Sequence, residues 1–108
     1  MERVRLQDRA TFQEGKMAKV ALLGTARVQA DLYCLRPGQS QAVHVHGEQD
    51  KLYYGIEGVG RIRVGAEEEL LEPGVLVLAP AGAEHGLTNP SDTPLVVLVA
   101  VVPPPPHA

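Results

Sequence analysis

The segment GVLVLAPAGAEHGLTN, residues 74–89, decides how this chain folds. It begins with alternating Val and Leu, a run that predicts a strand bounded by turn residues. Pro80 and Gly82 interrupt the run, and a proline followed closely by a glycine is typical of a tight turn. The segment therefore predicts two strands joined by a turn that places His85 at the start of the second strand.

The rest of the chain repeats this style of sequence on both sides of the segment. Stretches rich in Val, Leu, Ile and Tyr are separated by Gly, Pro, Asn or Asp, and no long window shows a helical period. We predict strands at residues 19–23, 29–35, 41–46, 52–57, 60–64, 68–71, 75–79, 85–89 and 95–102. The fold class is all-β, and many short strands favour either a sandwich or a barrel.

Two of the predicted turns carry the same dipeptide, Pro37-Gly38 and Pro73-Gly74. Proline restricts φ at the second position of a type II turn, and glycine accepts the positive φ that the third position requires. Both dipeptides are therefore predicted to close type II turns.

Length and composition predict one globular domain. The chain has 108 residues, of which 44% are hydrophobic and 21% are charged, and it shows no internal repeat or linker. Residues 1–102 are assigned to this domain. Residues 103–108, PPPPHA, are predicted to form a flexible tail because proline cannot donate to a sheet.

Several classes of function are disfavoured. The net charge is −3 and the basic residues are scattered, so we expect no nucleic-acid partner. The longest apolar run, residues 95–102, is far shorter than a membrane span of about 20 residues, so we expect no membrane partner. The single cysteine and a start that lacks an apolar signal segment predict a cytoplasmic location.

A pair of histidines precedes the deciding segment. His44 and His46 are separated by one residue on a predicted strand, so their side chains should project from the same face, where two imidazoles can hold one metal ion. A pair of exposed histidines on a solvated sheet face is the alternative. Spacing alone leaves both interpretations open.

The two segments together resemble the paired motifs of the cupin superfamily, in its small single-domain form. Gly74, Pro80, Gly82, His85 and Asn89 fill every fixed position of the second motif, residues 74–89. In the first motif, residues 38–58, the positions that match are Gly38, His44, His46 and Gly58. The resemblance implies a double-stranded β-helix, or jelly-roll, barrel. It also implies a divalent metal ion (zinc, iron, nickel or manganese) held by His44, His46 and His85.

One position departs from the family pattern. Lys51 stands where the first motif has a glutamate ligand, and a protonated ammonium has no lone pair for a metal. Three imidazoles still suit a divalent metal, although with weaker affinity than a set that includes a carboxylate. Glu48 or Gln49 could supply a fourth ligand, whereas Asp50 should face away from the side of Lys51.

Further candidate residues for the pocket follow from strand alternation. Lys51 and Tyr53 share a face and are the candidate catalytic residues, and Gln41 and Glu48 complete the candidate pocket. For Gln41, an exposed polar residue without a role in the pocket is an equal alternative. The favoured interpretation of Lys51 is a solvated lysine paired with a neighbouring carboxylate. The alternative is a pocket amine with a lowered pKa that acts as acid, base or anion anchor. Gly55, on the same face, is expected to leave space for a small ligand.

The sequence is compatible with three functions. The chain could be a metal-dependent enzyme of the dioxygenase, isomerase or decarboxylase type that the resemblance implies, acting on a small organic molecule. It could instead be a non-catalytic module that binds a small molecule, or a metal-free barrel for assembly, because fold does not imply function. We also expect a homodimer, formed by residues 12–23 adding a strand to the partner.

Overall fold

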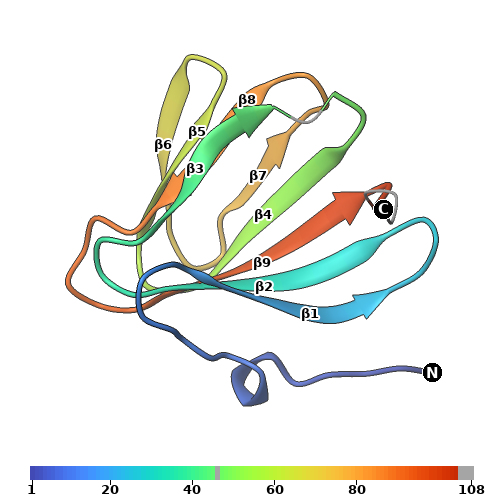
Figure 1. The fold of residues 1–108 in the computed structure, drawn as a ribbon, viewed down its shortest axis with the longest axis horizontal. Helices are drawn as coiled ribbons and strands as arrows, with labels where there is room; N and C mark the ends of the chain where they lie inside the picture. The colour runs from blue at the N-terminus through green and yellow to red at the C-terminus, as the bar shows by residue number, and fades with distance from the viewer. Residues whose placement is uncertain (46, 105–108) are drawn as a thin grey trace.

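A computed structural model describes residues 1–45 and 47–104, with residues 44 and 45 described by their backbone alone. The described residues form a short 3-10 helix, η1 (Leu6–Asp8), and nine strands (Figure 1). The strands are β1 (Ala18–Gly24), β2 (Gln29–Leu35), β3 (Ser40–Val45), β4 (Asp50–Glu57), β5 (Gly60–Val64), β6 (Glu67–Leu71), β7 (Leu76–Ala79), β8 (Glu84–Thr88) and β9 (Leu95–Val102).

The strands form two antiparallel sheets that face each other (Figure 1). The five-stranded sheet has the order β1-β2-β9-β4-β7, and the four-stranded sheet has the order β3-β8-β5-β6. Consecutive strands thus often lie in different sheets, as in a double-stranded β-helix. The structure confirms the predicted all-β jelly-roll barrel and decides between the two architectures that the strand pattern left open.

The main hydrophobic core lies between the sheets. Every second residue of β9 faces this core, because side chains alternate along a strand. The four-stranded sheet contributes Ile62, Leu71 and Leu87 from the opposite side. The buried members of the core are Tyr33, Leu35, Tyr53, Ile62, Leu71, Ala79, Leu87, Leu95, Val97, Val99 and Val101.

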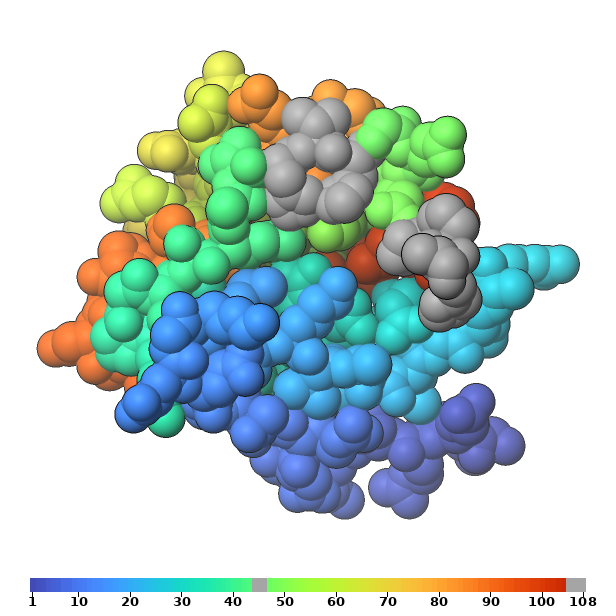
Figure 2. Space-filling view, viewed as in Figure 1, coloured from blue at the N-terminus to red at the C-terminus, as the bar shows by residue number. Residues whose placement is uncertain are grey.

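A second cluster covers part of the outer face of the five-stranded sheet. Leu32, Cys34 and Val96 are buried there, and Ala10 and Phe12 of the N-terminal segment pack against them. Figure 2 shows this segment, in dark blue, lying beside β1. Between the segment and the sheet is a depression of about 370 Å³. The N-terminal segment therefore packs on its own barrel.

The predicted elements agree closely with the observed ones. All nine predicted strands are present, and β2, β5 and β9 have the predicted bounds. Both predicted type II turns are confirmed: Gly38 and Gly74 have φ of 83° and 87°, and Gln39 N–H and Val75 N–H donate to Arg36 O and Glu72 O at 3.0 Å.

The two ends of the chain differ from the rest in how far the sequence predicted them. The short helix η1 near the N-terminus was not predicted, because three residues are too few to show a helical period. The predicted tail lies largely outside the described residues, since residues 105–108 are not described. Among the residues that are described, no helix is long and apolar enough to cross a membrane.

Candidate metal and ligand site

His85 lies at the start of β8 and is 1% exposed. The turn before it is closed by Ala83 N–H, which donates to Pro80 O at 3.1 Å, while Gly82 takes a φ of 85°. The His85 Nδ1 atom lies 3.0 Å from Ala83 O. Because a carbonyl oxygen can only accept, Nδ1 carries the hydrogen, and in the neutral ring the lone pair is then on Nε2.

Position 44 lies opposite His85 in the ladder between β3 and β8. Paired residues of an antiparallel ladder share a face of the sheet, so the backbone places residues 44 and 85 on the same face. His46 lies outside the described residues. Among the described side chains, no group of three or more His, Cys, Asp or Glu residues could hold a metal ion. This search did not include the side chains of His44 and His46, two of the three predicted ligands. The three-histidine site therefore stays a prediction.

An aromatic wall connects the two sheets next to His85. Tyr53 is fully buried, its ring centroid is 6.2 Å from that of His85, and it makes an edge contact with Tyr33, also at 6.2 Å. Its hydroxyl donates to Gln41 Oε1 at 2.8 Å. Gln41 and Tyr53 thus meet on the inner wall, because the register of β3 shifts between Gln41 and residue 44 and interrupts the strict alternation of its faces.

The two phenols are poor acids in this position. Burial raises the pKa of Tyr33 to about 12, and the nearby Asp31 carboxylate contributes to this rise. Burial also raises the pKa of Tyr53 well above its ordinary value, and the neighbouring Tyr33 adds to the effect. Both hydroxyls therefore keep their protons at neutral pH and serve as hydrogen-bond donors.

Lys51 is buried on the inner wall, which corrects the favoured sequence interpretation. It is only 5% exposed, whereas Asp50 and Glu57, the carboxylates of its own strand, are exposed. Burial lowers the pKa of the Lys51 ammonium to about 8, the positive charge of Lys19 lowers it as well, and the Asp31 carboxylate opposes both. The interpretation of Lys51 as a solvated lysine paired with a carboxylate is thus wrong. The structure shows the alternative, an amine buried on the inner wall.

Sequence reasoning missed Asp31, which lies on the inner side of β2 and is 2% exposed. Its Oδ1 accepts a hydrogen bond from Gln29 Nε2 at 3.0 Å, and its Oδ2 lies 3.9 Å from Nζ of the half-exposed Lys19. The signal for it was available: Asp31 and Tyr33 are two residues apart on a predicted strand and so share a face. Lys19, Asp31 and Lys51 are called the charge cluster below.

The short loop between β3 and β4 places its polar residues differently. Glu48 is exposed, so it does not line the inner wall as predicted for a pocket residue, while Gln49 is 7% exposed. Asp50 faces outward, as predicted, and its Oδ1 accepts a hydrogen bond from Ala81 N–H at 2.8 Å. Asp50 therefore holds the turn before His85 from outside.

The space beside Gly55 is occupied by backbone, which corrects another expectation. A Cβ at this position would meet Glu72 O and lie 2.7 Å from Glu72 C. The same approach is held by Gly55 N–H, which donates to Val75 O at 3.0 Å, and by Gly74 N–H, which donates to Gly55 O at 3.0 Å. Gly55 thus permits two chain segments to approach closely, and leaves no room for a ligand.

The last fixed position of the second motif is structural as well. Asn89 is 1% exposed, and its Nδ2 donates to Leu35 O at 3.0 Å and to Thr93 O at 2.9 Å. Its Oδ1 accepts from the N–H and the hydroxyl of Ser91. Asn89 therefore fixes the loop that connects β8 to β9.

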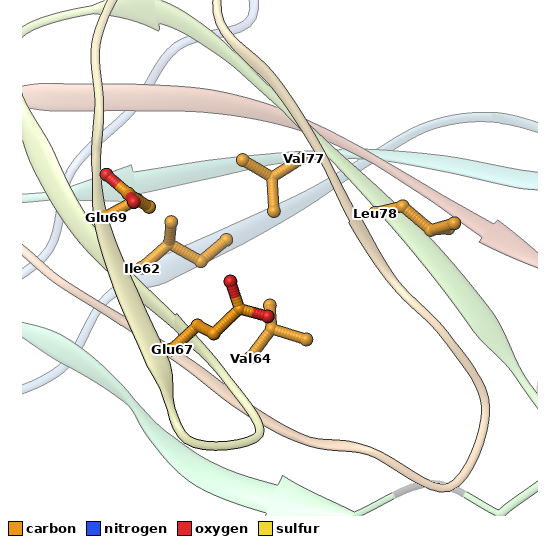
Figure 3. A pocket seen from close by; sticks show the side chains of 6 residues that line it. All are labelled: Ile62, Val64, Glu67, Glu69, Val77 and Leu78. Atoms are coloured by element: carbon orange, nitrogen blue, oxygen red, sulfur yellow. The ribbon is translucent and has the colours of Figure 1, made fainter.

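A shallow groove opens between the β5–β6 hairpin and β7 (Figure 3). Its volume is about 160 Å³, and Ile62 and Val77 form part of it. Glu67 and Glu69, both exposed, lie on the hairpin side, so their carboxylates give this opening a negative rim. This rim favours neutral or cationic groups over anions, and Lys51 is not among the residues that line the groove.

The inner wall of the barrel offers two kinds of chemistry. His85, buried and oriented by Ala83 O, presents an imidazole lone pair, while Lys51 presents an ammonium on the inner wall opposite, on β4. A buried imidazole in a fixed tautomer is the usual arrangement of a metal ligand. A buried ammonium attracts the negative end of a ligand.

The chain belongs to the cupin domain family, whose family model matches residues 31–101. The protein TT1209 from Thermus thermophilus has a similar crystal structure: the TM-score is 0.95, the sequences are 48% identical, and the match covers 97% of this chain and 100% of that one. The fold prediction is thereby confirmed.

Two curated proteins are similar over part of their length. TcmJ, the tetracenomycin polyketide synthase protein of Streptomyces glaucescens, is 35% identical over 69 residues, which are 64% of this chain and 46% of TcmJ. The mannose-1-phosphate guanylyltransferase of Klebsiella pneumoniae is 30% identical over 74 residues. That match takes in 68% of this chain and 16% of the guanylyltransferase.

Proposed function

We propose that this cupin binds a divalent metal ion through His44, His46 and His85 and holds a small organic molecule beside it, inside the barrel. The observation that carries the proposal is the setting of His85: it is buried, its tautomer is set by Ala83 O, and position 44 is its register partner. A zinc, iron, nickel or manganese ion fits a set of imidazoles.

The described residues fit such an ion. A ligating histidine usually donates its second ring N–H to a carbonyl or carboxylate, and Nδ1 of His85 has this partner. When bound, the metal would supply Lewis acidity toward an oxygen of the organic molecule. The chain's own contribution is to orient that molecule: Tyr53 and Gln41 form a hydrogen-bonded wall beside His85, and Lys51 supplies a positive charge.

The first test is metal content of untagged protein, measured by plasma mass spectrometry. We expect about one metal ion per chain in the wild type and less than about a tenth of that in His46→Ala and His85→Ala, because two imidazoles hold a divalent ion poorly. Lys51→Glu, which restores the family carboxylate, should raise metal affinity.

The matched control is His107→Ala, which removes a histidine from the predicted tail and should keep the full metal content. Wild-type protein that stays metal-free after incubation with iron, zinc, nickel and manganese would contradict the metal site. A barrel that binds small molecules without a metal would then remain.

We also propose that the chain forms a homodimer through the outer face of the five-stranded sheet. Five apolar side chains are exposed there on three adjacent strands, with Leu76 at 61% and Leu78 at 56%. The register pairs Leu52 with Leu78 and Tyr54 with Leu76, so these side chains form one patch. The members of this apolar patch are Leu52, Tyr54, Leu76, Leu78 and Val102.

A second copy is the occupant that suits this patch best. The five side chains of the patch are uncharged, and Asp50, the register partner of Val102, stands at its edge, where it can stay in water when two copies meet across a two-fold axis. A barrel of 108 residues also gains burial by pairing.

Light scattering at micromolar concentration is expected to give the mass of two chains. The double variant Leu76→Glu, Leu78→Glu should give one chain, because pairing would bury like charges. Leu70→Glu, on the exposed side of β6, is the matched control and should remain dimeric. A dimer that survives the double substitution would instead assign pairing to the predicted segment, residues 12–23, and a monomeric wild type would contradict both.

A further inference from the structure

We propose that the organic molecule held in this barrel carries a carboxylate and that Lys51 is its anchor. This inference rests on the proposed small-molecule function and names the class of ligand. It follows from the burial of Lys51, from its lack of a partner among the described residues, and from the charge balance of the charge cluster.

Lys51 is buried, and the described residues give its ammonium no direct polar contact. It lies on the inner wall beside Tyr53, and its strand neighbours in the ladder are Val101 on β9 and Ala79 on β7. Within the described part of the chain, no hydrogen bond and no ion pair within 4.0 Å involves its Nζ. A charge that is removed from water normally has a partner of opposite charge or is strongly destabilising, so Lys51 has the setting of a binding residue.

The one buried carboxylate among the described residues is already engaged. Asp31 accepts a hydrogen bond from Gln29 and lies 3.9 Å from Lys19 Nζ. Lys19, Asp31 and Lys51 together carry two positive charges and one negative charge, so the charge cluster has an excess of one positive charge. The repulsion from Lys19 contributes to the lowered pKa of Lys51, which at about 8 still leaves the amine protonated at pH 7.

A carboxylate fits this excess better than a phosphate does. One carboxylate carries a single negative charge and would bring the cluster to neutrality, whereas a phosphate dianion would leave it negative. Phosphate sites also gather several donors, commonly backbone N–H groups or arginines. The ladder neighbours of Lys51 are Val101 and Ala79, whose side chains offer no donor, and the Tyr53 hydroxyl already donates to Gln41.

The position of Lys51 also gives the ligand an orientation. Lys51 lies on β4 of one sheet, and His85 lies on β8 of the other, with Tyr53 in ring contact with His85 two residues further along β4. A molecule whose carboxylate is held by Lys51 would extend past Tyr53 toward His85. The polar end opposite the carboxylate would then be the part that meets the histidines.

The experiment is isothermal titration of the purified protein with formate, acetate and propionate, which each carry one carboxylate, at constant ionic strength. Acetamide and propionamide serve as uncharged analogues, and inorganic phosphate serves as the competing anion. We expect at least one carboxylate to bind, the amides to bind at least about tenfold more weakly, and Lys51→Met to lose at least about tenfold in carboxylate affinity. Lys16→Met, which removes an exposed ammonium, is the matched control and should bind like the wild type.

Several results would overturn the inference: equal binding of carboxylates and amides, unchanged carboxylate binding by Lys51→Met, no binding of any carboxylate, or tighter Lys51-dependent binding of phosphate. A second titration with chelator-treated protein separates this inference from the metal site. Carboxylate binding that depends on Lys51 in protein without metal would support the anchor even if the histidines held no ion. Loss of all binding with intact metal content would reject the anchor alone.

Discussion

Gly58→Ala is expected to destabilise the protein by about 3–5 kcal/mol, a large fraction of the stability of a typical domain. Gly58 ends the first motif and has a φ of 76°, a conformation that costs an alanine about 1 kcal/mol. In addition, an alanine Cβ would meet Pro94 O and lie 3.1 Å from Pro94 C. Backbone atoms cannot rotate away, so the loop before β9 would have to move.

Gly65→Ala is the control that isolates the backbone term. Gly65 also has positive φ, 60°, but a Cβ there would meet nothing within 4 Å, so we expect a loss of only about 1 kcal/mol. Urea unfolding of both variants at one protein concentration measures the difference. If both variants lost the same free energy of unfolding, the close approach of Pro94 to Gly58 would add no cost, which would mean that the loop before β9 can move to accommodate the Cβ.

Lys51→Met is expected to stabilise the protein by about 2–3 kcal/mol at neutral pH. Lys51 is buried, and its pKa is lowered from 10.5 to about 8, a difference that corresponds to about 3 kcal/mol against the charged form. Methionine has a similar length and no charge, so it removes this penalty and fills the same space. A gain in stability with a loss of carboxylate binding is the pattern of a binding residue.

The lowered pKa of Lys51 also predicts how the stability difference between the wild type and Lys51→Met changes with pH. Between about pH 8 and pH 10.5 the unfolded chain binds more protons than the folded one, so wild-type stability gains a contribution from Lys51 as pH rises through this window. Below about pH 8 the amine is protonated in both states, and the full penalty remains. The advantage of Lys51→Met should therefore be largest below pH 8 and should shrink toward pH 10.

Chelator-treated wild type, Lys51→Met and Lys16→Met should be compared by urea unfolding across this pH range. Lys16 is exposed, so Lys16→Met should differ little from the wild type at any pH. Groups other than Lys51 titrate in all three proteins and cancel in the differences. A Lys51→Met variant that is less stable than the wild type at neutral pH would mean that the ammonium makes a favourable contact in the folded chain.

The strands and turns of this chain could be predicted because their signals are local. Alternation of Val and Leu, interrupted by Pro73-Gly74 and by Pro80 with Gly82, places β7 and β8 within one or two residues of their observed bounds. The same period correctly put Lys51 and Tyr53 on one face and Asp50 on the other. The motif residues likewise indicated the cupin family, which the family model bears out.

Only the tertiary structure decided what that shared face meets. The Asp31 carboxylate acts on the Lys51 ammonium because β2 and β4 pair with the two edges of β9. These three strands are far apart in the chain. Gly55 is filled by the backbone of Glu72 for the same reason, since the turn before β7 packs across β4. Neither contact has a signature within its own strand.

The sequence by itself thus determined the elements, the alternation of their faces and the family, all of which depend on spacings of a few residues. The tertiary structure alone decided that Lys51 is buried, that the carboxylate acting on it is Asp31, and that the space beside Gly55 is closed. The physical reason is that burial and charge balance depend on which strands become neighbours, and pairing between distant strands is set by the packing of the whole barrel.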